Sequence, residues 1–174
     1  NNLTSRIGGG LGYKLPTIFT EEHEERQFQN ILPIDQSNAQ YEKSVGGNVD
    51  ITYTALLDEV KLMINPLFFY TRITHPLIVS PVGTQKQFVN ADGYTDSKGI
   101  DLSFRLSLDE IKFYTGYSYT IAQNHFNGQT SFYPLAPKHK IHFDLVYEIE
   151  NSLRVALESY YTSNQQLSDG SKGK

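Results

Sequence analysis

The sequence predicts an all-β protein, an antiparallel up-and-down meander of about seven strands that is part of a large transmembrane β-barrel. Three observations favour this fold. Apolar and polar residues alternate with a period of two in one segment after another, as they do in strands with one apolar and one polar face. The connections between these segments are alternately short and long, and tyrosines recur towards the ends of the apolar faces.

The alternating segments form three hairpins of one design. Residues 49–55 and 60–70 flank a turn at Asp58 and Glu59, and residues 100–108 and 111–121 flank a turn at Asp109 and Glu110. Residues 141–149 and 153–158 flank a third turn, and a glycine-rich strand over residues 3–14 precedes all three hairpins. From residue 45 onward we expect the strands to pair in sequence order, because short turns leave no room for crossovers.

The alternation also predicts which residues share a face of the sheet. The expected apolar set includes Ile100, Leu102, Phe104, Leu106, Ile141, Phe143 and Leu145. The expected polar set includes Asp101, Arg105, His142 and Asp144. Tyr70, Tyr119 and Tyr161 should mark the long-loop end of the apolar face, and Tyr53 and Tyr147 the short-turn end, since tyrosine favours membrane interfaces.

Three long connections, residues 15–44, 74–97 and 124–138, join the hairpins. Loops of this length are uncommon in compact soluble domains. Short turns at one rim and long loops at the other are typical of outer-membrane barrels. The alternative that these patterns leave open is a soluble β-sandwich whose inner faces carry the apolar residues.

Composition excludes several classes of function. The chain has 174 residues, a net charge of −4 and no cysteine, so it has neither the basic surface typical of nucleic-acid binding nor thiolates for a metal site. No apolar run approaches the roughly 20 residues of a transmembrane helix. A barrel strand crosses in about 9–11 residues with alternate side chains facing lipid, so the mildly polar mean hydropathy of −0.42 is compatible with a barrel.

Short motifs along the chain resemble those of TonB-dependent outer-membrane receptors. They are GYKLPTIF at residues 12–19, YEKS at 41–44, FFYTRI at 68–73, NADGY at 90–94, KGID at 98–101, GYSYT at 116–120 and PKHK at 137–140. The resemblance implies a closed barrel of about 22 strands with a plug inside. The whole chain, 1–174, would then be part of the barrel domain, with the plug, the N-terminal coupling segment and the final strand absent.

The resemblance also implies a function in the bacterial outer membrane. The receptor would capture a scarce extracellular small-molecule or metal-chelate ligand, such as a ferric siderophore, haem, cobalamin or an oligosaccharide. The energy-coupling protein TonB would drive uptake through the N-terminal part, and outer-membrane lipid would surround the barrel. A structural or adhesive barrel without transport is the alternative. We expect no enzyme activity, no cofactor and no nucleic-acid partner.

Two loops carry the residues that we expect to bind the ligand. In residues 15–44 they are Glu21, Glu22, His23 and Glu24, within an acidic run that ends at Glu25, and in residues 124–138 they are Phe126, Phe132 and Tyr133. Charge and aromatic surface at loop tips can meet a solute. The acidic run can also be read as a metal site or as a solvated loop.

Three groups of residues suggest other kinds of site. Gly8, Gly9, Gly10 and Gly12 lack the spacing of a phosphate-binding loop. His139 and His142 are three residues apart on a strand, so they should point to opposite faces and share no metal. Ser118, His142 and Asp144 could form a hydrolase triad on the polar face. No catalytic and no metal-binding residue is predicted.

Overall fold

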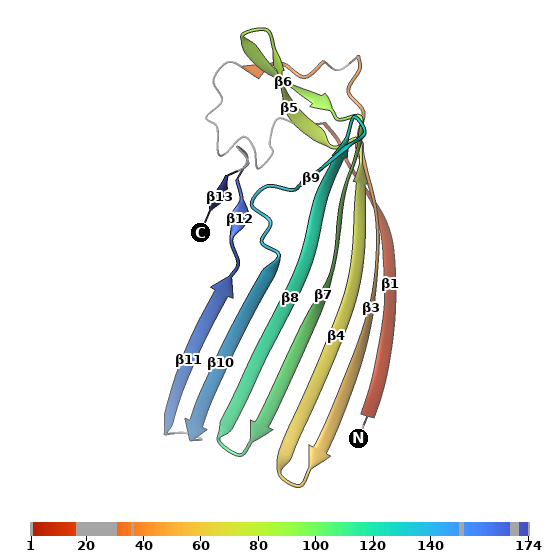
Figure 1. Cartoon of the computed structure of the whole chain (residues 1–174). Helices are drawn as coiled ribbons and strands as arrows, with labels where there is room; N and C mark the ends of the chain where they lie inside the picture. The colour runs from red at the N-terminus through yellow and green to blue at the C-terminus, as the bar shows by residue number, and fades with distance from the viewer. Residues whose placement is uncertain (1, 17–30, 36, 150–151, 168–170, 174) are drawn as a thin grey trace.

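The chain folds into one large antiparallel sheet with smaller sheets at one end (Figure 1). The computed structural model describes residues 2–16, 31–35, 37–149, 152–167 and 171–173. The long strands are β1 (Asn2–Lys14), β3 (Glu42–Leu57), β4 (Val60–Thr74), β7 (Gly93–Leu108), β8 (Ile111–Phe126), β10 (His139–Ile149) and β11 (Leu153–Thr162). The short strands are β2 (Ile31–Leu32), β5 (Leu77–Val82), β6 (Gln85–Asn90), β9 (Gln129–Phe132), β12 (Gln165–Gln166) and β13 (Lys172–Gly173).

The seven long strands lie in the order β1-β3-β4-β7-β8-β10-β11, and each pair is antiparallel. This confirms the meander that the sequence predicts. Strands β1 and β11 are the two ends of this row, so the sheet is open within the described residues. Those residues do not form two packed sheets with Greek-key connections, which argues against the sandwich alternative. Nor do they include a helix with the length and apolarity required to cross a membrane.

Two-residue turns join the strands at one end of the sheet. Asp58 and Asp109 have φ angles of 53° and 45°, and tight hairpin turns need such positive φ values, which aspartate tolerates better than most residues. The predicted turns at Asp58-Glu59 and Asp109-Glu110 are therefore confirmed. Part of the third turn lies outside the described residues, but Ser152 N donates to Ile149 O at 3.1 Å across it.

The pairing register separates the residues into the two predicted faces. Leu102 lies opposite Tyr117, which lies opposite Ile141 on the next strand. Arg105 lies opposite Tyr114, which lies opposite Asp144. Since directly paired residues share a face, these rows confirm that the apolar and polar sets lie on opposite sides.

The apolar face is exposed. Phe68, Leu102 and Leu145 have exposed fractions of 46%, 40% and 38%, and rings pack edge to face along the sheet rather than across a core, as Phe113 does with Phe143 at 5.2 Å. Only five apolar residues of the described chain are buried: Ala55, Leu77, Phe88, Ala91 and Val146. An apolar surface of this extent is not stable against water, whereas a barrel wall covers it with lipid.

Tyrosines lie on the apolar face at both of its ends, as predicted. Tyr70 and Tyr119 pair with Lys98 and Ile100 towards the long loops. Tyr147 pairs with Ile111 beside the short turns. Tyrosine is typical of membrane interfaces, because its ring is apolar and its hydroxyl is polar.

The long-loop end contains more secondary structure than the sequence indicates. Residues 74–97 do not form one loop, because β5 and β6 make a hairpin there and β7 already begins at Gly93. Strand β8 likewise extends to Phe126 and pairs with β9. These segments lack a regular alternation of apolar and polar residues: β5 reads LIVSPV and β6 reads QKQFVN. The pattern that predicts a strand with one apolar face is therefore absent there.

Candidate functional site

The polar face carries a hydrogen-bonded cluster on β1, β3 and β4. Arg6 Nε lies 3.0 and 3.2 Å from the two carboxylate oxygens of Asp50, which is only 7% exposed. Asn65 Nδ2 donates to Thr52 Oγ1 at 2.7 Å and to Asp50 Oδ1 at 3.3 Å. The carboxylate is thus held from two sides, while the Arg6 side chain remains 77% exposed. A charge-assisted pair of this kind fixes the guanidinium and leaves its remaining donors open to a solute.

A shallow hollow of about 660 Å³ adjoins this cluster. Arg105 lines it from β7, with its guanidinium carbon 4.7 Å from the centre of the Tyr114 ring. The two arginines of the hollow, Arg6 and Arg105, are both oriented by a partner on the same face. The arrangement favours anionic or hydrogen-bond-accepting groups, since guanidinium groups only donate.

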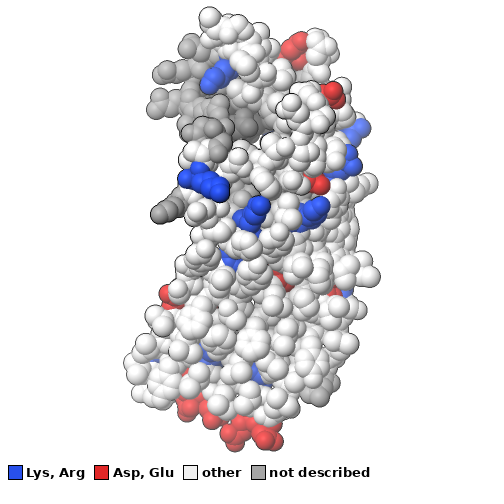
Figure 2. All heavy atoms as spheres, viewed as in Figure 1, with Lys and Arg blue, Asp and Glu red and all other residues white. Residues whose placement is uncertain are grey.

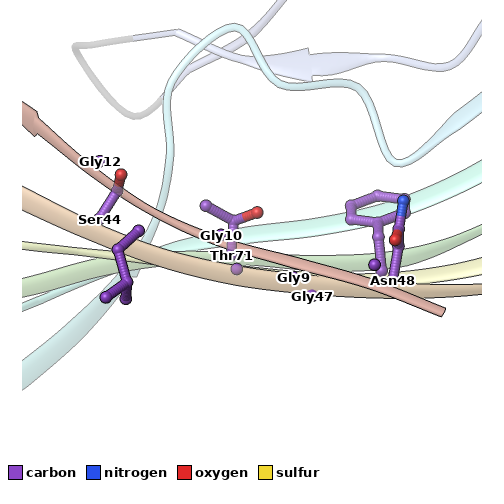
Figure 3. A pocket seen from close by; sticks show the side chains of 11 residues that line it. Gly9, Gly10, Gly12, Ser44, Gly47, Asn48 and Thr71 are labelled. Carbon is purple, nitrogen blue, oxygen red and sulfur yellow. The ribbon is translucent and has the colours of Figure 1, made fainter.

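A glycine-lined wall lies above this hollow on the same face (Figure 3). The side chains of Ser44, Asn48 and Thr71 point to one side of β3 and β4, beside the glycines of β1. A Cβ added to Gly12 would lie 2.6 Å from Ser44 Oγ, whereas one added to Gly10 would meet nothing within 4 Å. The glycines belong to strand β1 and not to a phosphate-binding loop. They leave a smooth recess of about 460 Å³ on the polar face.

A second hollow, here called the hairpin hollow, lies beside β6 at the long-loop end, with a volume of about 470 Å³. Asn90 holds it together: its Oδ1 accepts from Gln40 N at 2.7 Å, and its Nδ2 donates to the carbonyls of Gln40 and His75 at 2.9 and 2.8 Å. His75 has a φ of 54°, and its Nδ1 is buried without a hydrogen-bond partner. Sequence reasoning did not select these residues. Asn90 belongs to the NADGY motif, which contributed only to the resemblance to outer-membrane receptors.

An ionised carboxylate lies at the hairpin hollow. Asp35 Oδ1 accepts from the hydroxyl of Ser37 at 2.5 Å and from its amide at 3.0 Å, and Oδ2 accepts from Asn38 Nδ2 at 2.7 Å. The hydrogen bond from the Ser37 hydroxyl, followed by that from Asn38, lowers the pKa of Asp35 below its ordinary value. The group therefore remains charged at neutral and mildly acidic pH.

A third hollow of about 450 Å³, here called the rim hollow, lies between the segment after β9 and the β12–β13 pair. Phe132, Tyr133, Lys138, Tyr161 and Lys172 are among the residues that line it. Lys138 Nζ lies 4.0 Å from the centre of the Phe132 ring. Backbone bonds fix the walls, with Leu135 N donating to Gln166 O at 2.9 Å and Ser163 N to His139 O at 2.9 Å.

The residues predicted from the sequence to bind a ligand are placed as follows. Phe132 and Tyr133 come together in the rim hollow and are 42% and 43% exposed. Phe126 ends β8 and pairs with Gly93 and Gln129, and the register places it on the polar face, opposite to that of Phe132. Glu21, Glu22, His23 and Glu24 lie outside the described residues, as does Glu25. The remainder of the chain contains no group of three possible metal ligands.

A stacked cluster fixes the β8–β9 hairpin. The Arg72 guanidinium carbon lies 3.5 Å from the centre of the Tyr94 ring, which stacks on His125 at 4.4 Å. His125 Nε2 lies 3.0 Å from Asp96 Oδ1, and its Nδ1 lies 3.1 Å from Thr130 Oγ1. The cluster is on the apolar side of the sheet but beyond the last apolar residues, so its role is to hold the rim in place.

The hydrolase alternative finds no support in the geometry. Ser118 pairs with Lys140, whereas His142 lies opposite Gly116 and Asp144 opposite Tyr114. No side-chain hydrogen bond links Ser118, His142 and Asp144, although all three are described, and Asp144 Oδ1 has no partner. His139 is on the other face, where its Nδ1 lies 2.9 Å from the Tyr117 hydroxyl, as the strand spacing predicts.

The chain was compared with known proteins. No family model and no curated protein sequence matches it. Among solved structures, the FrpB iron transporter from Neisseria meningitidis (F3-3 variant) aligns with a TM-score of 0.67 and 15% sequence identity over 97% of this chain. The chain spans 26% of that transporter's length. At this identity the similarity shows the fold: the chain has the architecture of one part of an outer-membrane transporter barrel.

Proposed function

We propose that this chain is a wall segment of an outer-membrane receptor that imports a scarce ligand, a ferric chelate being the first candidate. The observation that carries the proposal is the separation of faces: one side of the sheet is predominantly apolar and exposed, and the other side is a polar face with anchored charges. Lipid and a water-filled interior are the environments that suit such a sheet. The fold of the iron transporter supports the same assignment.

The polar face supports a role in ligand passage. Arg6 and Arg105 supply oriented guanidinium donors in the lower part, and above them the glycine-lined wall supplies a recess with the polar side chains of Ser44, Asn48 and Thr71 in its lining. Ferric chelates commonly carry carboxylate or phenolate oxygens, which accept such hydrogen bonds. The interior of the barrel would thus hold the ligand weakly at several places rather than tightly at one.

The long-loop end supports a role in ligand capture. The hairpin hollow is rich in amides and carries the charged Asp35, and the β5–β6 hairpin that forms it has its own small core around Phe88, which is 2% exposed. A preformed polar hollow on a rigid loop is what selective capture requires. Phe126, one of the residues predicted to bind the ligand, ends β8 at the same end of the sheet.

Uptake in cells tests the proposal. Cells that express the complete protein should accumulate radioactive iron from a ferric chelate only when TonB is present. Replacing the β5–β6 hairpin, residues 77–90, with a short Gly-Ser linker should abolish the uptake but leave the barrel in the membrane. The control is Glu59→Gln in the short turn at the opposite rim, for which we expect normal uptake.

Two results would contradict the proposed function. Uptake of a panel of ferric chelates, haem, cobalamin and oligosaccharides that does not depend on the protein would show that it is not an importer. Uptake that persists without TonB would show passive diffusion through a pore.

A further inference from the structure

Basic side chains continue the apolar face at its long-loop end. The register places Lys43, Arg72 and Lys98 on this face, since Arg72 lies opposite Val45 and Lys98 lies opposite Tyr70. Figure 2 shows basic side chains in a row across the upper part of the surface, above a broad region with few charged atoms. A charge on the lipid side of a barrel is costly within hydrocarbon, so these residues mark the level where headgroups begin.

The opposite end of the same face has the opposite charge. The short turns carry Asp58, Glu59, Asp109 and Glu110, and Figure 2 shows the acidic side chains gathered there. On this face Lys43, Arg72 and Lys98 outnumber Asp96 at the long-loop end, whereas the short turns carry the acidic residues. Anionic headgroups are repelled by the acidic rim and attracted by the basic one.

Two further basic residues line the rim hollow, next to β8 and β10 and at the same end of the sheet. Thr120 N donates to Lys138 O at 2.9 Å, and Thr120 pairs with Gly99 on its other side. Lys138 therefore lies at about the same level of the sheet as Lys98, which precedes Gly99. Lys138 and Lys172 both line the hollow. Neither lysine has an acidic partner within 4.0 Å among the described residues.

The rim hollow borders the apolar face of the sheet. Lys138 follows the register of Thr120 on the polar side, but its Nζ lies 4.0 Å from the centre of the Phe132 ring. His139 pairs with Tyr119 and contacts Tyr117, and Tyr161 pairs with Ile141, all on the apolar side. Phe132 lies opposite Gln123 on that side as well. A molecule in this hollow therefore has hydrocarbon directly below it, which does not suit a solute on its way through the barrel.

We propose that the rim hollow binds the phosphorylated sugar headgroup of an anionic lipid. The ammonium groups of Lys138 and Lys172 would pair with phosphate. The rings of Phe132, Tyr133 and Tyr161 offer stacking surface for a sugar ring, and the amides of residues 164–166 match its hydroxyls. The acyl chains would lie along the apolar face below Tyr161. This site rests on the membrane placement in the proposed function but not on transport.

Lipid binding to the complete protein in neutral detergent tests the proposal. The probe is a bisphosphorylated disaccharide lipid, titrated by native mass spectrometry beside its dephosphorylated form. We expect the phosphorylated lipid to bind at least about tenfold more tightly. The double variant Lys138→Gln/Lys172→Gln should lose about tenfold or more in affinity, because each lysine near a headgroup contributes separately.

Two controls separate this site from general charge effects. Lys140→Gln removes the same charge two residues further along the chain, where Lys140 pairs with Ser118 and is not part of the lining of the rim hollow, and it should bind the lipid as the native protein does. The double variant Lys138→Arg/Lys172→Arg should retain binding, which shows that the glutamine variant did not simply unfold the rim.

Three results would overturn the proposal. The first is equal affinity of the native protein and the glutamine double variant. The second is an equal loss in Lys140→Gln, which would mean that only net charge matters. The third is competition by inorganic phosphate at the concentration at which the lipid binds, which would make the hollow a site for free phosphate. Uptake of ferric chelate plays no part in these measurements, so the lipid site and the transport function fail separately.

Discussion

The two ends of the sheet differ in their residue pattern and in the contacts that hold the strands. Near the short turns, every long strand alternates between an exposed apolar side and a polar side, and two-residue turns connect the strands. Near the long loops, the strands continue without alternation, and specific contacts such as the Arg72-Tyr94-His125 stack hold them. The difference teaches that one exposed apolar face constrains residue type only along part of each strand. Beyond that part, individual hydrogen bonds and ring contacts determine the structure.

A charge in the middle of the apolar face should produce the largest effect. Leu102 lies on β7 between Lys98 and the short turn, opposite Tyr117. Leu102→Arg should lower the free energy of unfolding by about 2–4 kcal/mol, the usual cost of arginine on the lipid side near mid-membrane. Ser103→Arg, one residue away on the polar face, should cost much less. Urea unfolding of the complete protein in lipid vesicles measures both, and equal losses would refute the assignment of faces.

Two glycines on the polar face allow the second comparison. A Cβ at Gly99 would collide with the backbone carbonyl of Tyr119 and approach Phe69 Cζ to 2.8 Å, whereas Gly10 has open space. Gly99→Ala should therefore destabilise the protein by about 1–3 kcal/mol, as overpacking does. Gly10→Ala should change the free energy of unfolding by less than about 0.5 kcal/mol, as substitutions away from such contacts do. Thermal unfolding in detergent distinguishes the two, and a sensitive Gly10 would mean that the recess is filled in the complete protein.

The third comparison concerns the long-loop end itself. Arg72→Ala removes the guanidinium from the Tyr94 ring, a contact worth about 0.5–1 kcal/mol at exposed sites. We expect faster hydrogen exchange at residues 93–98 and 123–126, with residues 100–108 unchanged, because the cluster holds only the rim. Slower exchange, or a change that reaches the short turns, would show that the two ends are not independent.

The smallest effect should come from pH at the hairpin hollow. The pKa of Asp35 is lowered chiefly by the Ser37 hydroxyl, so its contribution to the turn is present above the ordinary aspartate value of about 3.9 and is lost as pH falls through the lowered pKa. Cleavage by pepsin at residues 33–40 should increase only below that ordinary value. Asp35→Asn should remove the pH dependence, and an increase that begins above pH 4 in the native protein would contradict the lowered pKa.

The sequence predicted the strands with one apolar face but little of the structure at the long-loop end. The faces of residues such as Phe104 and Asp101 could be predicted because apolar and polar residues alternate without a break in this segment. The turns could be predicted from Asp58 and Asp109. The β5–β6 hairpin was missed because its core rests on a few residues around Phe88, too few to form a pattern. The hairpin hollow depends on Asn90, whose side chain forms two hydrogen bonds with Gln40, 50 residues away in the sequence, and one with His75. The ligand roles of Phe132 and Tyr133 remain predictions, although the rim hollow brings the two together.

Cysteine accessibility along β7 tests the central claim, the two-faced wall, most directly. The chain has no cysteine, so single cysteines at positions 101–105 can be introduced one at a time into a cysteine-free form of the complete protein in native membranes. A small membrane-impermeant maleimide should label the positions of Asp101, Ser103 and Arg105 from the water-filled interior, and it should not label those of Leu102 and Phe104, which face lipid. Uniform labelling, or labelling of Leu102 and Phe104 alone, would contradict the account.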